Sequence, residues 1–120
     1  MAGPTTLSLQ QKRVLHVLGY LYLRMGQYAR ARRLFAALAA LDPSDVHARC
    51  SLAYACIQLE DGEAAVHTLT GLGPGDPIPG GDATLYLLLA RAHTLLGEDQ
   101  AAREALAAFW KTHTQGEQGQ

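Results

Sequence analysis

Apolar residues recur at three- and four-residue intervals along most of the chain, which is the spacing of one face of an amphipathic helix. Most of them are Ala and Leu, whereas Val and Ile are scarce. This bias favours helices, because β-branched side chains lose more rotamer freedom in a helix than Ala or Leu does. The pattern predicts an all-α chain with six helices, at about 9–25, 28–41, 44–59, 62–72, 83–96 and 99–113.

The ends of these helices are predicted from capping residues and from helix breakers. Ser8 and Gln11 form a capping-box pattern at the start of the first helix. Asp42 is expected to cap the third helix, with Pro43 at its first position and Ser44 as a further helix-start residue. Residues 71–81 contain eight Gly or Pro, which predicts a loop, and the polar segment from Thr114 is expected to be a flexible tail.

A repeat of 34 residues organises the predicted helices. Pro43 and Pro77 lie 34 residues apart, and each follows an Asp. Before Pro43, large and small residues hold a fixed spacing, at Leu15, Leu18, Gly19, Tyr22, Gly26, Ala31 and Phe35. The second unit keeps Leu52, Ala53, Ala65, Leu69 and Pro77, and the third matches after a three-residue insertion, at Tyr86, Leu89, Ala90, His93, Gly97, Ala102 and Leu106. The small residues let paired helices approach closely, and the large ones fill the space beside them.

This spacing resembles the signature of the tetratricopeptide repeat. The resemblance implies one domain over residues 1–120, a right-handed superhelix of three helix-turn-helix repeats at about 12–45, 46–79 and 83–116. Arg49 and Cys56 stand where the family usually has aromatic residues. A bundle of unrelated antiparallel helices is the alternative, but it does not explain three units in phase.

In tetratricopeptide proteins the first helix of each pair lines the inner wall, so the resemblance implies where a partner binds. The wall positions are Arg13, His16, Tyr20, Leu23 and Arg24 in repeat one, His47, Cys50, Tyr54, Ile57 and Gln58 in repeat two, and Leu87, Arg91, Thr94 and Leu95 in repeat three. Tyrosines, aliphatic residues and arginines are typical of binding hot spots. His16, Tyr20 and Thr84 replace the Lys and Asn with which some family members grip a terminal carboxylate, so that kind of co-chaperone is not expected.

The last repeat carries apolar residues that no later segment covers. The helix at 83–96 is apolar nearly all round, which favours burial on every side. The helix at 99–113 ends with Leu106, Phe109 and Trp110, whereas solenoids normally finish with a polar-faced cap. We therefore expect Phe109 and Trp110 to contact a partner, and the chain to self-associate without one. The alternative is that both side chains fold back onto repeat three.

Charge and cysteine content add to this interpretation. The apolar fraction of 48% and the charged fraction of 18% are those of an ordinary globular protein. Residues 1–50 carry seven Lys and Arg against two Asp, and the rest carries three against nine acids, so a basic end either meets an acidic partner or is simply solvated. Cys50 and Cys56 would lie about 9 Å apart along one helix, too far for a disulfide. Free thiols and the lack of a signal peptide or membrane span predict a cytosolic protein.

The sequence offers little for catalysis, metals or cofactors. His47, Cys50 and Cys56 lack further ligands at the spacing of a tight zinc site. Gly71, Gly73 and Gly75 lack the Lys-Ser/Thr pair of a phosphate loop. We expect no enzyme, no cofactor and a packed His93. Nucleic-acid binding is the other class considered, because Arg30, Arg32 and Arg33 cluster near Lys12 and Arg13, but no basic stripe extends beyond residue 49.

A narrower resemblance rests on the first repeat: Gly19-Tyr20-Leu21-Tyr22-Leu23, Gly26-Gln27, Arg30-Ala31, Leu34, Ala37-Leu38 and Leu41-Asp42-Pro43. Together with the short length, these segments resemble the YscY/SctY family of bacterial type III secretion chaperones. That likeness implies a cytoplasmic chaperone that binds a small secreted partner (an SctX-like protein), with which it engages the export gate. Chaperones of needle or translocator subunits, and a generic repeat scaffold, stay open as alternatives.

Overall fold

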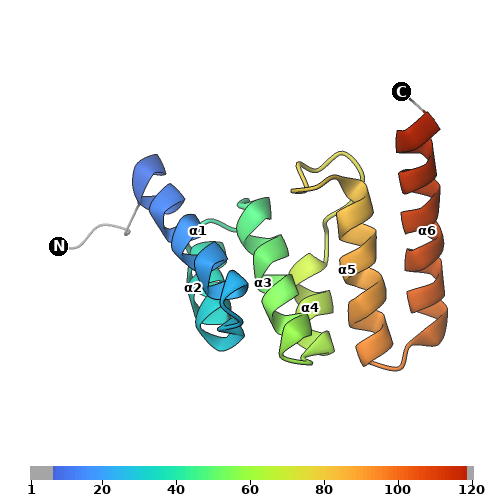
Figure 1. The fold of residues 1–120 in the computed structure, drawn as a ribbon, viewed down its shortest axis with the longest axis horizontal. Coiled ribbons are helices and arrows are strands. Elements are labelled where there is room, and N and C mark those ends of the chain that lie inside the picture. Colours follow the sequence, from blue (N-terminus) through green and yellow to red (C-terminus); the bar gives the residue numbers. More distant parts are fainter. Residues whose placement is uncertain (1–6, 119–120) are drawn as a thin grey trace.

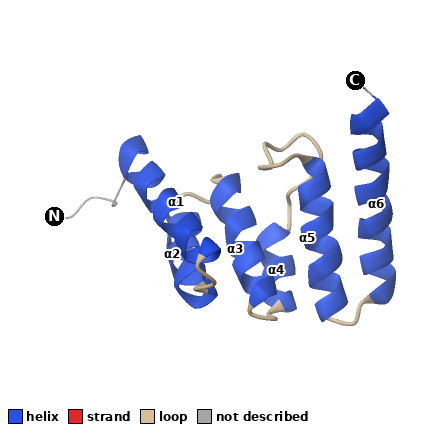
Figure 2. Cartoon of the chain, viewed as in Figure 1, coloured by secondary structure: helices blue, strands red, loops and turns tan. Residues whose placement is uncertain are grey.

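The computed structural model describes residues 7–118, and all regular secondary structure in that range is helical (Figures 1 and 2). The prediction of an all-α chain with six helices is confirmed. The helices are α1 (Leu9–Arg24), α2 (Tyr28–Leu41), α3 (Val46–Gln58), α4 (Gly62–Leu69), α5 (Asp82–Leu95) and α6 (Asp99–Gln118).

The six helices form three hairpins that stand in a row in chain order, with α1 at one end and α6 at the other (Figure 1). Each helix packs against the next, and in addition α1 contacts α3 and α3 contacts α5. Within the described residues, the second helices α2, α4 and α6 do not contact one another. The first helices therefore make one continuous layer, as expected for a helical repeat superhelix.

The turn inside each hairpin has the same conformation and fixes the register of the repeats. Gly26, Glu60 and Gly97 all adopt positive φ, at 73°, 61° and 72°. The N–H of the next residue then bonds a carbonyl near the end of the preceding helix: Gln27 to Tyr22, Asp61 to Cys56 and Glu98 to His93. These turns lie 34 and then 37 residues apart, so the third unit continues the repeat after three extra residues.

Close packing inside each hairpin requires a small residue on its first helix opposite a larger residue on its second helix. A Cβ atom added to Gly19 of α1 would overlap the ring of Phe35 of α2, whose Cε2 atom would lie only 2.7 Å away. The equivalent pairs are Ala53 with Leu69 and Ala90 with Leu106. Among these three pairs, the largest side chain, Phe35, thus lies opposite the one glycine, Gly19, and Phe35 is fully buried.

The capping prediction is confirmed for α1 and wrong for α3. Ser8 and Gln11 form the reciprocal capping box. Asp42, however, ends α2, and its carboxylate accepts hydrogen bonds from the backbone and the hydroxyl of Ser44. These bonds hold residues 42–45 in a turn, so α3 begins only at Val46, after the N-cap Asp45, whose side chain accepts from the N–H of Ala48.

Two helix ends in the second half of the chain differ from the prediction. α4 ends at Leu69, three residues earlier than expected, because Thr70 is extended and Gly71 has a φ of 89°. In the loop that follows, Ile78 is buried in the core with Leu69 and Leu85, so the loop also packs the third repeat onto the second. α6 continues to Gln118 instead of ending near residue 113, since no proline interrupts the polar segment.

The close contact between Gly19 and Phe35 predicts that the effects on stability of substitutions at these two positions are coupled. Gly19→Ala should destabilise the chain by about 1–3 kcal/mol, because the new methyl group meets the Phe35 ring. Combining it with Phe35→Leu, which recreates the Ala–Leu pair of repeat two, should cost at least about 0.5 kcal/mol less than the sum of the single changes. Urea unfolding of the four proteins measures this cycle, and strict additivity would contradict it.

The turn comparison predicts that Glu60→Gly stabilises the chain. Glu60 is the only non-glycine residue with positive φ in the described range, and glycine takes this conformation without the steric cost that a Cβ atom imposes. We expect a gain of about 0.5–1 kcal/mol in the free energy of unfolding. Gly97→Ala is the matched control and should lower stability by a similar amount; a loss of stability in Glu60→Gly would refute the interpretation.

Candidate functional site

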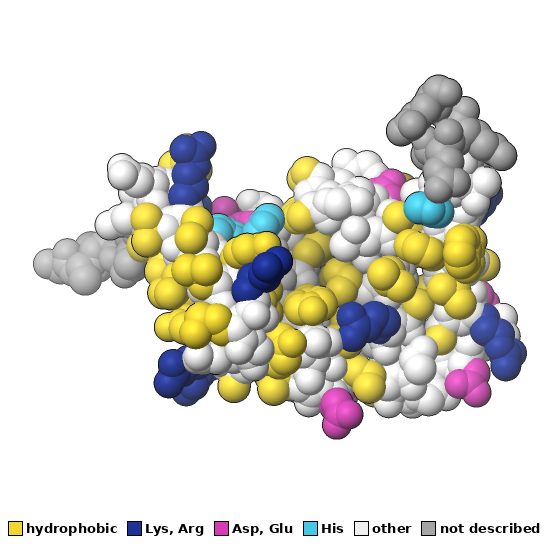
Figure 3. Space-filling view, viewed as in Figure 1, with side chains coloured by type: hydrophobic (Ala, Val, Ile, Leu, Met, Phe, Trp, Pro, Cys, Tyr) yellow, Lys and Arg dark blue, Asp and Glu magenta, His cyan; other side chains and the backbone are white. Residues whose placement is uncertain are grey.

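The wall of first helices collects side chains from equivalent positions in the three repeats. His16, Cys50 and Leu87 occupy one such position, and Tyr20, Tyr54 and Arg91 occupy another. Figure 3 shows that apolar side chains, interspersed with basic and histidine groups, cover much of this face. We call the predicted positions on α1, α3 and α5 the wall.

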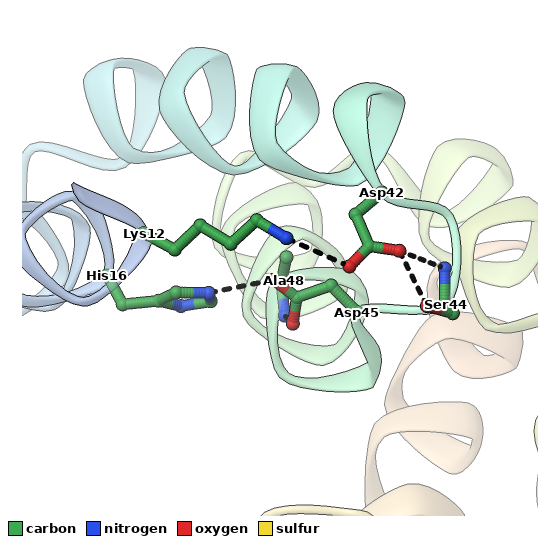
Figure 4. Close-up of polar contacts among 6 residues, drawn as sticks. All are labelled: Lys12, His16, Asp42, Ser44, Asp45 and Ala48. Atoms are coloured by element: carbon green, nitrogen blue, oxygen red, sulfur yellow. Dashed lines mark hydrogen bonds and ion pairs between the residues drawn. The ribbon is translucent and has the colours of Figure 1, made fainter. Parts of the chain in front are cut away.

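At one end of the wall, polar contacts bind α1 to the start of α3 (Figure 4). The His16 Nε2 atom lies 2.9 Å from Asp45 Oδ2, while the other carboxylate oxygen of Asp45 caps α3. Lys12 lies one turn before His16, and its ammonium group is 3.3 Å from Asp42. His16 is therefore half-buried and engaged in holding two repeats together.

His47 lies against His16, with the two rings edge to face and their centroids 4.6 Å apart. Although His47 as a whole is exposed, the partial burial of its ring lowers its pKa, and the neighbouring His16 imidazole lowers it further, while Asp45 acts in the opposite direction. The neutral form of His47 is therefore favoured in the folded chain.

A second set of polar contacts crosses the middle of the wall. The side-chain amide nitrogen of Gln58 (Nε2) donates to the Tyr28 hydroxyl at 3.2 Å, and Gln58 Oε1 accepts from Arg91 at 2.7 Å. The Arg91 guanidinium also lies over the ring of Tyr54, 5.9 Å from its centroid, and that ring packs edge to face on Tyr28. These contacts fix the orientation of Tyr54 and Arg91 before any partner arrives.

Two shallow depressions adjoin at Arg91 and Thr94. The first lies between α3 and α5, and its lining residues are Ile57, Gln58, Glu60, Arg91, Thr94 and Leu95. The second lies between α5 and α6, and its lining residues are Leu87, Ala90, Arg91, Thr94, Asp99, Ala102, Arg103 and Leu106. Leu87 and Leu95 are 40% and 42% exposed, so both depressions offer apolar surface beside a fixed cation.

Exposed aromatic rings lie at both ends of the wall. Tyr20 is 53% exposed, and the Arg24 guanidinium lies 5.9 Å from its ring centroid. On α6, Trp110 is 58% exposed and packs against half-buried Phe109, with 5.5 Å between ring centroids. Phe109 also stacks on His113 of the same helix, whereas most of the Trp110 surface is exposed.

The predicted site residues differ in how far their side chains are available. The exposed ones are Arg13, Tyr20, Arg24, His47, Leu87, Arg91, Leu95 and Trp110, and the half-buried ones are His16, Leu23, Tyr54, Gln58 and Phe109. Ile57 is only 4% exposed and packs in the core, as does Cys50, so Ile57 contributes no more than the floor of a depression. The sequence prediction did not include Asp99 and Arg103, because the repeat pattern assigns the wall to the first helices alone. The sequence signal for these two residues is their spacing with Leu106, which places all three on one face of α6.

The groups considered for other chemistry are largely engaged in the fold. Among the described residues, no cluster of three or more His, Cys, Asp or Glu is arranged to hold a metal ion. Cys50 and Cys56 are free and buried, and burial raises the pKa of both thiols. Of the basic residues considered for nucleic acid, Arg32 is paired with Asp61 at 2.7 Å and Lys12 with Asp42, so they do not form a free cluster.

The lowered pKa of His47 predicts a pH dependence of stability. The unfolded chain holds this proton up to a pKa of about 6.5 and the folded chain only to a lower one, so the contribution is complete above about pH 6.5 and is lost as pH falls through the folded pKa. We expect the free energy of unfolding to fall between about pH 7 and pH 5, and to fall less steeply in His47→Gln. Urea titrations at several pH values measure this; parallel slopes in the two proteins would contradict it.

Comparisons with known proteins complete the description of this surface. The chain matches no curated protein sequence. Within the described residues, no helix has the length and apolar character to cross a membrane. The sequence profile of the tetratricopeptide repeat matches residues 16–77, slightly more than half of the 120 residues, and this match agrees with the recurring turns and the layer of first helices. The chain therefore belongs to the tetratricopeptide repeat family, whose members are non-catalytic scaffolds for protein interaction.

Proposed function

We propose that this protein is a chaperone of bacterial type III secretion, which holds a small SctX-like partner along the wall and helps to deliver it to the export gate. The proposal places the protein in the bacterial cytoplasm. It is supported by the resemblance carried by the first repeat, from Gly19-Tyr20 to Asp42-Pro43, and by a wall long enough for an extended or helical segment.

The observation that carries the proposal is the set of exposed apolar side chains along the wall and on the neighbouring α6. Tyr20, Leu87, Leu95 and Trp110 are each at least 40% exposed, although all could gain from burial. Between them lie Tyr54 and Arg91, whose orientation is already fixed by Tyr28 and Gln58. Preoriented aromatic and arginine groups lose little freedom on binding, which favours a stable complex.

Co-expression tests the identity of the partner. The chain is tagged and produced together with an SctX-like protein, a needle subunit or a translocator, each in a separate experiment. We expect a stoichiometric complex with the SctX-like protein that survives size-exclusion chromatography. Preferential retention of the needle subunit or the translocator would move the protein to those chaperone classes, and binding of none of them would leave a generic scaffold.

Substitutions on the wall test where the partner binds. Tyr20→Ala and Leu87→Ala should each weaken the complex by about 1–3 kcal/mol, because each removes apolar surface that the partner covers. Leu41→Ala is the matched control, since Leu41 is 48% exposed but lies at the end of α2, outside the wall. Isothermal titration calorimetry gives the affinities, and circular dichroism confirms folding. Equal affinities for all four proteins would place the binding surface elsewhere.

A further inference from the structure

The outer face of α1 is an uncovered apolar ridge. Val14, Val17, Leu18, Leu21 and Met25 are between 39% and 65% exposed and share one side of the helix. α1 contacts only α2 and α3 within the described residues, and both lie on the side of Gly19. In Figure 3, apolar side chains gather over α1 at this end of the molecule. We call these five residues the α1 ridge.

The repeat identifies what normally covers this face. The α3 residues equivalent to Val14, Leu18 and Leu21 are Ala48, Leu52 and Ala55, which pack against Phe35 and Leu38 of the preceding repeat. The α5 residues equivalent to them are Leu85, Leu89 and Ala92, which pack against Leu69 of the preceding repeat. In both cases the face is buried by the second helix of the hairpin before it. The α1 ridge is the same face, and within the described residues no helix of a preceding hairpin packs on it.

The opposite end of the molecule carries the complementary surface. Ala31 and Phe35 of α2, and Ala65 and Leu69 of α4, are buried by the first helix of the next repeat. Their equivalents on α6 are Ala102 and Leu106, and Leu106 is 42% exposed, because within the described residues α6 contacts no helix other than α5. Both residues line the depression between α5 and α6. This C-terminal depression lies where the first helix of a fourth repeat would pack.

The two ends also differ in the charges that they carry. Arg13 and Arg24 lie 11 residues apart on the same side of α1, next to the ridge, and the chain contains no acidic residue before Asp42. Glu98, Asp99 and Glu104 stand at the start of α6, and Asp99 lines the C-terminal depression together with Arg91 and Arg103. A symmetric pairing of two α1 helices would bring four arginines together, and α1 contains no acidic residue to neutralise them. Contact between opposite ends also brings arginines near one another, but it supplies Asp99 and the neighbouring Glu98 and Glu104 as counter-charges.

We infer that the protein associates with itself head to tail, with the α1 ridge of one copy packed into the C-terminal depression of the next, so that the repeat continues across the junction. Tyr20 of one copy then takes the place next to Arg91 of its neighbour, because the two residues hold equivalent positions in consecutive repeats. Such an interface is heterologous, so it generates an open chain or a ring and not a symmetric dimer. The inference concerns the chain alone and does not depend on the proposed client.

Complementation between two single-face variants tests this arrangement. Val14→Glu places a carboxylate on the ridge but leaves the depression intact, and Leu106→Glu places one in the depression but leaves the ridge intact. Both positions are exposed, so both variants should fold, which circular dichroism checks. In sedimentation velocity the unmodified chain should form assemblies that grow with concentration, whereas each variant alone should stay monomeric. An equimolar mixture should form a one-to-one dimer and nothing larger, because only one intact junction is available.

Further variants make the outcome decisive. Leu21→Glu and Leu106→Ser alter the same two faces and should reproduce the monomers and the dimer, since the equivalents of Leu21, Ala55 and Ala92, are fully buried between repeats. Leu41→Glu, at an exposed position outside both faces, should leave the assemblies unchanged. The inference is overturned if the unmodified chain is monomeric at every concentration, if Leu106→Glu alone still dimerises, as a symmetric α1 contact requires, or if the mixed variants stay monomeric.

Discussion

The close approach of the two helices in each hairpin is the constraint on which the rest of the structure depends. At the first hairpin it requires a residue without a side chain at Gly19, because Phe35 fills the space that a methyl group would take. In the second hairpin an alanine faces a leucine. This distribution of volume places Phe35 and Leu69 where the next first helix covers them, at 0% and 2% exposure. Helix spacing inside a hairpin thus also sets the packing between repeats, and with it the alignment of the wall.

Much of this arrangement could be predicted from the sequence, because it depends on residue size at a fixed period. The spacing of Gly19, Ala53 and Ala90 identified the hairpins, and the structure places each between its helices. The start of α3 could not be predicted in the same way. Asp42 and Asp45 are both good capping residues. Which of them caps α3 depends on local hydrogen bonds: the Ser44 hydroxyl donates to Asp42, and Asp45 is left to accept from the N–H of Ala48.

The candidate site was predictable as a surface, but not in the state of its individual side chains. A repeat position tells which residues face the wall, and Tyr20, Leu87 and Leu95 are exposed there. It does not tell which of them already bind one another. His16 contacts Asp45, and Arg91 donates to Gln58. These contacts could not be predicted from the sequence, because they join residues about 30 positions apart that meet only once neighbouring hairpins have packed. The same long-range packing buries Ile57.

The wall and the ends of the array meet at the depression between α5 and α6. Leu87 and Arg91 belong to the wall, and Leu106 belongs to the face of α6 that no other described helix covers, yet all three line this one depression. A client seated there and a second copy seated there would exclude each other. Taken together, the proposed client binding and the inferred self-association would therefore compete, and by mass action a rising client concentration would break up head-to-tail assemblies. This coupling needs no conformational change, because Leu87, Arg91 and Leu106 line the same depression.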